Sequence, residues 1–400
     1  MRRLPIIVML IALFAAYPVA AQLQFEFTYE ADEQYRVIST VEQDVWYNGR
    51  LSHHATILNR ISIEVADAAD GRGYHRATFL TSEESTDGRE VFTWGEEYYS
   101  EFWRDQFGHY EIEDRYFMPV VRDVPVFPAT ALSPGDTWSA PGSEVHDFRR
   151  SFKIPDAFHF PIPVSYTYTG DIERDGREFA VIQIAYNVFH RPTQRYPGAT
   201  YPVRITGSSR QTVYWDIRAG RPHSYEETYE FLFGLSSGDQ VLFEGTAEAR
   251  IVEASRMDRT QVINEIRTEL DQRGFEDQDV VEDERGVTIR LDTIMFPADS
   301  AFLRESELAK LRSIAEILAN YSDRDILITG HTALAGTEDG RLALSRERAM
   351  SVGQYLLELG VRQPDQLIMR GVGASAPVAD NATEEGMRLN RRVEITILEN

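Results

Sequence analysis

Cysteine is missing from the 400 residues of this sequence. Disulfide bonds therefore cannot staple the fold, and each domain has to be stable through its own core. A bacterial lipoprotein needs a cysteine at its mature amino terminus to carry the lipid. We therefore expect that this chain is not anchored as a lipoprotein.

Positive charge is scarce as well. The 41 lysine and arginine residues face 64 aspartate and glutamate residues, which gives a formal net charge of -23. A field of that sign repels phosphate polyanions, so we expect no nucleic-acid partner. The same acidity argues against attachment to anionic lipids through a basic patch.

Long apolar runs are confined to the amino terminus. Arg2 and Arg3 precede an apolar stretch at 4–16, and small residues occupy 19–21. This order is typical of a cleaved secretory signal peptide, which we place at residues 1–21. An uncleaved membrane anchor is the alternative. No other stretch is long and apolar enough for a transmembrane helix, so we expect none in the mature chain.

The motifs of common enzymes are missing too. The sequence contains no HExxH, no Gly-x-Ser-x-Gly and no P-loop. His53 and His54 are adjacent, so on a strand they point to opposite faces and cannot hold one metal ion together. Acidic pairs such as Glu96 and Glu97 are common in so acidic a chain and are more often solvated than catalytic. We therefore predict a protein that is not an enzyme, with no cofactor and no metal site.

What the sequence does contain, over residues 22–252, is strand after strand of alternating apolar and polar positions. Two proline-rich stretches, 119–141 and 155–163, interrupt this pattern, and we expect loops or crossovers there because proline cannot sit in a central strand. The remaining runs flank strong hairpin signals, which predicts long antiparallel strands in meander order. These turn signals are Asn48-Gly49, Asp175-Gly176, Ala219-Gly220 and Gly238-Asp239.

Three interpretations of this β-rich region stay open. The one we favour is a soluble antiparallel sandwich or strongly curved sheet with a concave face. The second is a membrane β-barrel, because the strands alternate and aromatic residues between Trp46 and Phe107 could form girdles. Charges on both faces of candidate strands, as at Glu42 and Asp44, argue against it. The third is an enzyme.

The alternation stops near residue 254, and we place a domain boundary at 253–260. Apolar positions that share one helical face follow, and Gly274 closes this helix. A hairpin then surrounds Gly286. We assign residues 253–285, the helix and the start of the hairpin, to the carboxy-terminal domain, whose core is 286–400. The apolar positions of the helix are Val262, Ile263, Ile266 and Leu270.

Strands and helices alternate within 286–400, which predicts a βαβαβ domain with a mixed sheet and helices on one side. The whole chain is therefore predicted to be an α+β multidomain protein. The expected elements are a helix at 305–321, a strand at 325–329, a helix buried through Leu342, Ala349, Val352, Leu356 and Leu359, and strands at 366–370 and 392–398.

Five segments of this domain carry a recognisable pattern. They are Ile294-Met-Phe-Pro-Ala-Asp-Ser300, Ile328-Thr-Gly-His-Thr-Ala-Leu-Ala-Gly336, Leu344-Ser-Arg-Glu-Arg-Ala349, the run from Gly371 to Gly386, and Asn390-Arg-Arg-Val-Glu-Ile395. In this order they resemble the OmpA-like domain of OmpA, Pal and MotB, the peptidoglycan-associating module of diderm bacterial envelopes. The resemblance covers about 286–400, whereas the β-rich region resembles no family that we recognise.

The resemblance implies a binding site for the peptidoglycan stem peptide. In the family an aspartate and an arginine hold the ammonium and carboxylate of a diamino acid. Arg348 occupies the arginine position, and its planar guanidinium suits a carboxylate. Ala333 stands where the family has aspartate, so half of the clamp is missing and association is expected to be weak. Further candidates are Thr332, Arg341, which replaces a family asparagine, and Arg391.

Two alternatives concern single arginines. One residue of the pair Arg391 and Arg392 is implied to point to the groove beside Arg348, while the other holds the fold. Arg348 itself could instead form a salt bridge with Glu338, Asp339 or Glu347.

The main functional prediction is a non-catalytic protein of the periplasm or the outer membrane that associates with peptidoglycan. In the alternative, the OmpA-like domain has lost peptidoglycan and serves as a scaffold for an envelope protein partner, while the β-rich module binds a ligand or partner.

Overall fold

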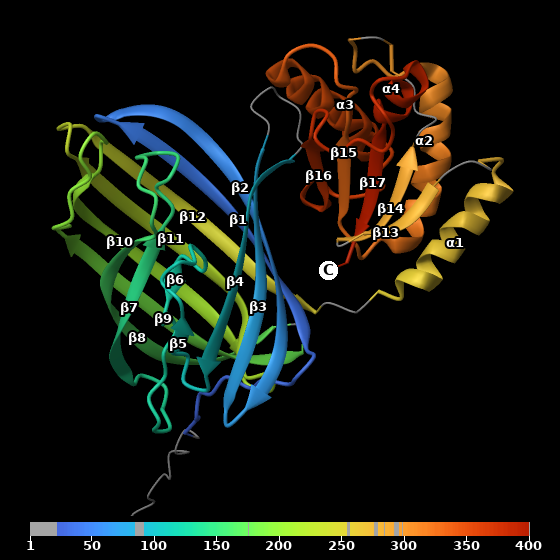
Figure 1. Ribbon diagram of the computed structural model, residues 1–400. Helices are drawn as coiled ribbons and strands as arrows, with labels where there is room; N and C mark the ends of the chain where they lie inside the picture. The colour runs from blue at the N-terminus through green and yellow to red at the C-terminus, as the bar shows by residue number, and fades with distance from the viewer. Residues whose placement is uncertain are drawn as a thin grey trace, which may run out of the picture.

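The computed structural model describes residues 22–84, 92–174, 176–253, 257–275, 279–283, 285–291, 296–297 and 299–399. The predicted signal peptide at 1–21 and Asp175 of one predicted turn lie outside the described residues. Figure 1 shows a large sheet of long curved strands and, beside it, a smaller body of helices and strands. In the described ranges no helix is long and apolar enough to cross a membrane.

The larger body is a sheet of twelve strands in which every pairing is antiparallel. The strands are β1 (Gln34–Tyr47), β2 (Arg50–Ala69), β3 (Arg72–Glu84), β4 (Phe92–Asp105), β5 (Tyr110–Ile112), β6 (Val121–Arg122), β7 (Thr137–His146), β8 (Phe158–Arg174), β9 (Arg177–His190), β10 (Pro202–Asp216), β11 (Arg221–Leu235) and β12 (Gln240–Glu253).

The first and last strands of this sheet pair with each other. β1 pairs with β12 along its length as well as with β2. From β12 the ladder continues through β11, β10, β9 and β8 to β7. Among the described residues, the ladder is interrupted between β4–β5 on one side and β6–β7 on the other. The domain is therefore a nearly closed barrel, and the predicted sandwich or curved sheet was too coarse a description.

Apolar side chains of the strands point into the barrel. On β8 every second side chain from 158 to 168 is buried, and most of those between are exposed. The segment before β1 contributes Phe25 and Phe27, which pack against Phe127 and Trp215; the rings of Phe27 and Trp215 lie 4.8 Å apart. The core of this domain thus lies inside the barrel, beneath an outer face of polar side chains.

Prolines lie inside β8, although we predicted a loop at 155–163. Pro161 and Pro163 both pair with β7, whereas β8 pairs with β9 only from Val164 onward. The strand has one neighbour where the prolines lie, so their missing N–H groups can face the free edge. The stretch 119–141 is irregular as predicted, apart from β6 and the start of β7.

Three predicted turns are hairpins in the structure. Asn48 and Gly49, between β1 and β2, adopt positive φ angles of 49° and 75°. Gly220 and Gly238 also have positive φ angles, in the turns from β10 to β11 and from β11 to β12. These turns confirm the meander order of the strands that they join.

His75 of β3 is a buried histidine that stacks on Phe102, and its Nδ1 donates a hydrogen bond to the Gly73 carbonyl at 2.9 Å. Burial, with the nearby charge of Arg104, lowers the pKa of His75 to about 4. The unfolded chain, with a pKa near 6.5, takes up this proton first. The histidine's contribution to stability is therefore present above pH 6.5 and is lost as the pH falls towards 4.

When the pH falls from 6.5 to 4, the free energy of unfolding of the barrel should decrease in both proteins. We expect the decrease to be about 3 kcal/mol smaller in a His75→Phe variant than in wild type. All five tryptophans lie before residue 216, so tryptophan fluorescence during urea unfolding reports the barrel. His53→Phe, at an exposed position, is the control and should keep the wild-type pH dependence. If the free energy of unfolding of wild type and of His75→Phe changed equally with pH, His75 would not be the group responsible.

The smaller body alternates strands and helices, as predicted. β15 pairs parallel with β16 and antiparallel with β17, which also pairs with β14, so the sheet is mixed. Its elements are α1 (Arg259–Gln272), β13 (Asp279–Asp283), β14 (Gly286–Leu291), α2 (Glu305–Leu318), the 3-10 turn η1 (Ala319–Tyr321), β15 (Ile326–Gly330), α3 (Glu338–Glu358), the 3-10 turn η2 (Pro364–Gln366), β16 (Leu367–Gly371), α4 (Glu384–Asn390) and β17 (Val393–Leu398).

The two faces of the smaller sheet have different neighbours. Ile326 and Ile328 of β15 belong to the core that the sheet shares with α1, α2 and α3. Leu327, between them, packs on the opposite face with Ile368 and with Leu80 of β3. Figure 1 shows the smaller body against the outside of the barrel near β2, β3 and β4. Helices lie on one side, as predicted, because the barrel covers the other.

A carboxylate is buried where the two bodies meet. One oxygen of Asp325 accepts hydrogen bonds from Nη1 of Arg36 and from Nε of Arg60, both at 3.0 Å. Asp325 is 2% exposed and each arginine 5%. Arg36 and Arg60 come from β1 and β2, so this cluster joins the barrel to the start of β15.

The apolar face of α3 is shorter than the sequence pattern predicts. Ala349, Val352 and Leu356 are buried as expected, but Leu342 and Leu359 are exposed. Leu359 follows the last helical residue, and Leu342 lies in the first turns, so both are at the ends of the helix. The predicted burial of these two leucines was wrong because only the middle of α3 lies on the sheet.

Candidate functional site

The helix that carries Arg348, α3, begins at a capped end. The hydroxyl of Thr337 accepts a hydrogen bond from the Gly340 amide at 3.2 Å, which satisfies one of the first N–H groups of the helix. Glu338 and Asp339 occupy the first turn, where negative charge complements the helix dipole. The start of α3, and with it the distance to Arg348, is thus set locally.

Glycines let α3 approach the sheet closely. A Cβ atom at Gly330, the last residue of β15, would clash with the carbonyl oxygen of Ser345. One at Gly371, the last residue of β16, would clash with the amide nitrogen of Arg346. Only glycine permits this contact. It brings Arg348 beside the loop that follows β15.

The guanidinium of Arg348 is enclosed and is held by neutral groups. Its Nε donates to the Ser300 carbonyl at 3.1 Å, and its Nη1 makes a long 3.5 Å hydrogen bond to the His331 carbonyl. The ring of Phe296 lies 5.1 Å from the guanidinium carbon. Arg348 is 1% exposed. The predicted ligand residue thus lies against Phe296 and Ser300.

Within the part of the chain that the structure describes, no carboxylate forms an ion pair with Arg348. Burial and the nearby charge of Arg391 lower the pKa of Arg348, while Asp299 acts in the opposite direction. An arginine nevertheless remains charged at any physiological pH. Among the described residues, none of the carboxylates considered for a salt bridge forms an ion pair with Arg348; these are Glu338, Asp339 and Glu347.

The loop after β15 contains a polar group without a partner. The Thr332 amide donates to the Gly373 carbonyl at 2.9 Å, and the Leu334 amide donates to Oδ1 of Asn381 at 3.0 Å, which fixes the backbone. The Thr332 hydroxyl is buried and has no hydrogen-bond partner within the described part of the chain. Buried polar groups normally have hydrogen-bond partners, so this hydroxyl has hydrogen-bonding capacity left. Ala333 next to it is also buried.

The two neighbouring arginines have separate places. Arg392 is buried, and its Nε donates to Oε1 of Glu394 at 2.8 Å. Burial alone would raise the pKa of Glu394, but the His331 ring and the Arg392 charge lower it to about 2. Arg391 is exposed, and it is close enough to Arg348 to affect its pKa. Arg392 therefore belongs to the fold, and Arg391 adds positive charge near Arg348.

Most of the candidate residues come together. Arg348, Thr332 and Ala333 lie at the loop after β15. The charge of Arg391 is near enough to lower the pKa of Arg348. Arg341 instead donates from its Nη1 to the Gly336 carbonyl at 2.6 Å, and within the described part of the chain it forms no hydrogen bond or ion pair with the other candidates. In chemical terms, a guanidinium, a hydroxyl without a partner among the described residues and a second positive charge can together accept an anion such as a carboxylate.

The fold and these contacts agree with a known family. Residues 295–391 match the model of the OmpA family. This segment is an OmpA-family domain. The match does not reach the barrel, which precedes residue 295.

Relatives match over the OmpA-family domain. Outer membrane porin F of Pseudomonas fluorescens is 35% identical over 111 residues, which are 28% of this chain and 33% of the porin. The peptidoglycan-binding protein ArfA of Mycobacterium tuberculosis is 38% identical over 104 residues, or 26% of this chain and 32% of that protein. An outer membrane protein from Borrelia burgdorferi B31 has a solved structure that is 34% identical, covers 30% of this chain and 96% of its own, and has a TM-score of 0.26. The chain spans about a third of the length of the first curated relatives that it matches.

Sequence reasoning did not predict what holds Arg348. The Ser300 carbonyl and the Phe296 ring, which enclose the guanidinium, lie about fifty positions before it in the chain. Both belong to the segment 294–300 that carried the resemblance. The phenylalanine and the acidic-serine turn of that segment were the available signal, but only for the fold.

Proposed function

We propose that this protein is a non-catalytic component of the bacterial envelope whose OmpA-family domain associates with peptidoglycan. The observation that supports this most is the Arg348 guanidinium, which carries its charge without a carboxylate partner among the described residues. Relatives that match this chain include a protein named for peptidoglycan binding and a peptidoglycan-associated lipoprotein. A stem-peptide carboxylate is the anion that such a domain would bind.

In this proposal the carboxylate replaces the long hydrogen bond between Arg348 and the His331 carbonyl and accepts two parallel bonds from the guanidinium. The ligand would also have to reach the guanidinium past the Phe296 ring and the Ser300 carbonyl, which lie against it. The Thr332 hydroxyl supplies a neutral hydrogen bond. Ala333 offers nothing to an ammonium group, so the ligand is held at one end.

The proposed place of the protein is the periplasm or the periplasmic side of the outer membrane. The expected signal peptide supports this, and so do relatives named as outer membrane proteins. The barrel, with apolar side chains inside and polar ones outside, suits an aqueous compartment.

Co-sedimentation with insoluble peptidoglycan sacculi tests the proposal. Residues 22–400 should pellet with sacculi from the source organism and stay in solution without them. A protein that never pellets, at any concentration that the assay reaches, would exclude the proposal. It would favour the alternative function, a scaffold that contacts another envelope protein.

Ala333→Asp is expected to strengthen sacculus binding about tenfold or more, because it restores a carboxylate for the ammonium group of the diamino acid. Ala335→Asp, two residues further along the same loop, is the matched control and should leave binding unchanged. The measurement is the protein concentration at half-maximal sedimentation. Weaker or unchanged binding by Ala333→Asp would show that no ammonium group lies at this position.

A further inference from the structure

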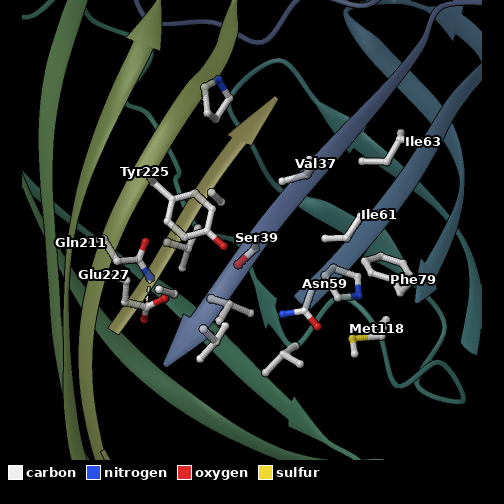
Figure 2. A pocket seen from close by; sticks show the side chains of 18 of the residues that line it. Val37, Ser39, Asn59, Ile61, Ile63, Phe79, Met118, Gln211, Tyr225 and Glu227 are labelled. Carbon is white, nitrogen blue, oxygen red and sulfur yellow. Dashed lines mark hydrogen bonds between the residues drawn. The ribbon is translucent and has the colours of Figure 1, made fainter. Parts of the chain in front are cut away.

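The barrel encloses a cavity that the proposed wall binding does not use. Its volume is about 660 Å³, within the range of pockets that hold small organic molecules. Side chains from β1, β2, β3, β10, β11 and β12 surround it, and the segment 118–125 lines it where the ladder between β5 and β6 is interrupted (Figure 2).

Most of the cavity wall is apolar. Figure 2 shows aliphatic, aromatic and thioether side chains that point into one space from four parts of the chain. An apolar space of this size gains free energy by taking up hydrocarbon, since burial is worth about 25 cal/mol per Å² of apolar surface. The wall residues labelled there are Val37, Ile61, Ile63, Phe79 and Met118.

A short row of polar side chains crosses this wall. Gln211 of β10 lies opposite Glu227 of β11 in the strand register, and Ser39 of β1 lies opposite Asn59 of β2. Tyr225 lies between these two pairs, because it faces Ala249 of β12, which in turn faces Ser39. Figure 2 shows this row, from Gln211 and Glu227 at one end through Tyr225 and Ser39 to Asn59. The cavity is thus amphipathic, with one hydrogen-bonding region.

Glu227 is the acidic group of this region, and it has hydrogen-bonding capacity left. Its Oε1 accepts hydrogen bonds from Ser209 at 2.7 Å and from Gln211 at 3.1 Å, whereas its Oε2 accepts none from the described residues. Burial raises the pKa of Glu227, and the charge of Glu144 acts in the same direction. Glu144 is buried and accepts one hydrogen bond from the Tyr186 hydroxyl and one from Nε2 of His146. These two carboxyl groups disfavour an anionic head group beside Glu227, whereas Arg104, Arg221 and Arg250 line other parts of the cavity wall.

We propose that the barrel binds a single-chain amphiphile whose hydrocarbon chain fills the cavity and whose head group, an amine or a hydroxyl, donates a hydrogen bond to Glu227. A carboxylate or phosphate head is disfavoured, because it would bring a third negative group to Glu227 and Glu144. Amine and hydroxyl heads share the required donor and differ in charge, so direct comparison separates them.

Displacement of the fluorescent probe N-phenyl-1-naphthylamine from residues 22–400 tests this inference. The probe should brighten on binding. Dodecylamine or dodecanol should displace it at concentrations at least tenfold below those that dodecanoate requires, all below their critical micelle concentrations. The more effective of the two identifies the head group. Equal displacement by dodecanoate, or a probe that does not brighten, would overturn the proposal.

Substitutions locate the binding. In Glu227→Gln, the concentrations at which the three competitors displace the probe should lie within about threefold of one another. Glu230→Gln, at an exposed position on the same strand, should preserve the wild-type order of these concentrations. Ala247→Trp, which projects into the cavity, should abolish probe binding, and Thr246→Trp, on the outer face of β12, should retain it. If Ala247→Trp does not fold, Ile61→Trp, at another position that lines the cavity, replaces it. Wild-type binding by a folded cavity variant would place the ligand elsewhere and overturn the proposal.

Discussion

Arg348→Ala is expected to reduce binding to peptidoglycan sacculi by about 30-fold or more. Truncation of one partner in a buried charged hydrogen-bonded pair costs roughly 2 to 5 kcal/mol. In this domain, which has Ala333 in place of the aspartate, Arg348 is the sole charged group of the clamp that the family resemblance implies. Its loss should therefore remove most of the affinity. The measurement is the concentration for half-maximal co-sedimentation.

Three companion variants make this result specific. Arg346→Ala removes an exposed arginine from the same helix and should bind like wild type. Arg348→Lys keeps the charge but loses the planar pair of donors, so it should fall between wild type and Arg348→Ala. Arg391→Ala should weaken binding less than Arg348→Ala does. Because Arg348 is buried, each variant needs a melting curve. A folded Arg348→Ala that sediments like wild type would refute the assigned role.

Asp325→Ala should destabilise the protein by about 3 to 5 kcal/mol, because it leaves two buried guanidinium groups, Arg36 and Arg60, without their shared carboxylate. Because the cluster joins the barrel to the smaller domain, the loss of stability should affect both parts. Urea unfolding followed by tryptophan fluorescence reports the barrel, and circular dichroism at 222 nm reports the helices of the other domain. We expect both midpoints to fall.

Two variants separate this effect from a general loss of charge. Asp323→Ala, two residues away and largely exposed, should change stability by less than about 0.5 kcal/mol. The triple replacement Asp325→Leu, Arg36→Met and Arg60→Met removes the whole cluster and should recover most of the loss, since apolar residues can replace a buried ionic cluster at little cost. If Asp325→Ala unfolds like wild type, the cluster does not join the two bodies.

Local features of the fold were predictable, and long-range closure was not. A hairpin turn depends on a few neighbouring residues that adopt positive φ, such as Asn48 and Gly49, so the sequence alone can indicate it. Closure depends on the pairing of β1 with β12, about two hundred residues apart, and alternation is the same in an open sheet and in a barrel. The predicted loop around Pro163 was wrong for a related reason. A strand can contain this proline only where one of its edges has no partner, and the sequence does not show which edge of β8 that is.

The candidate site shows the same limit. The motif located Arg348 and the loop residues Thr332 and Ala333, since each lies in a segment of fixed spacing. Contacts between segments were out of reach, and the Ser300 carbonyl that binds Arg348 is one of them. The sequence did contain a signal for the choice between Arg391 and Arg392. Arg392 lies immediately before β17 and two residues before Glu394, a spacing that in an extended chain places both side chains on one face and allows their ion pair.

Selective ¹⁵N labelling of arginine in residues 22–400, followed by titration with a soluble muropeptide, tests peptidoglycan recognition most directly. The side-chain Nε–H signal of Arg348 should shift and saturate with the muropeptide, that of Arg391 should shift less, and that of Arg392, paired with Glu394, should stay in place. Arg348→Lys identifies the signal. A muropeptide that binds without moving the Arg348 signal, or that produces no shift at saturating concentration, would contradict the proposed site.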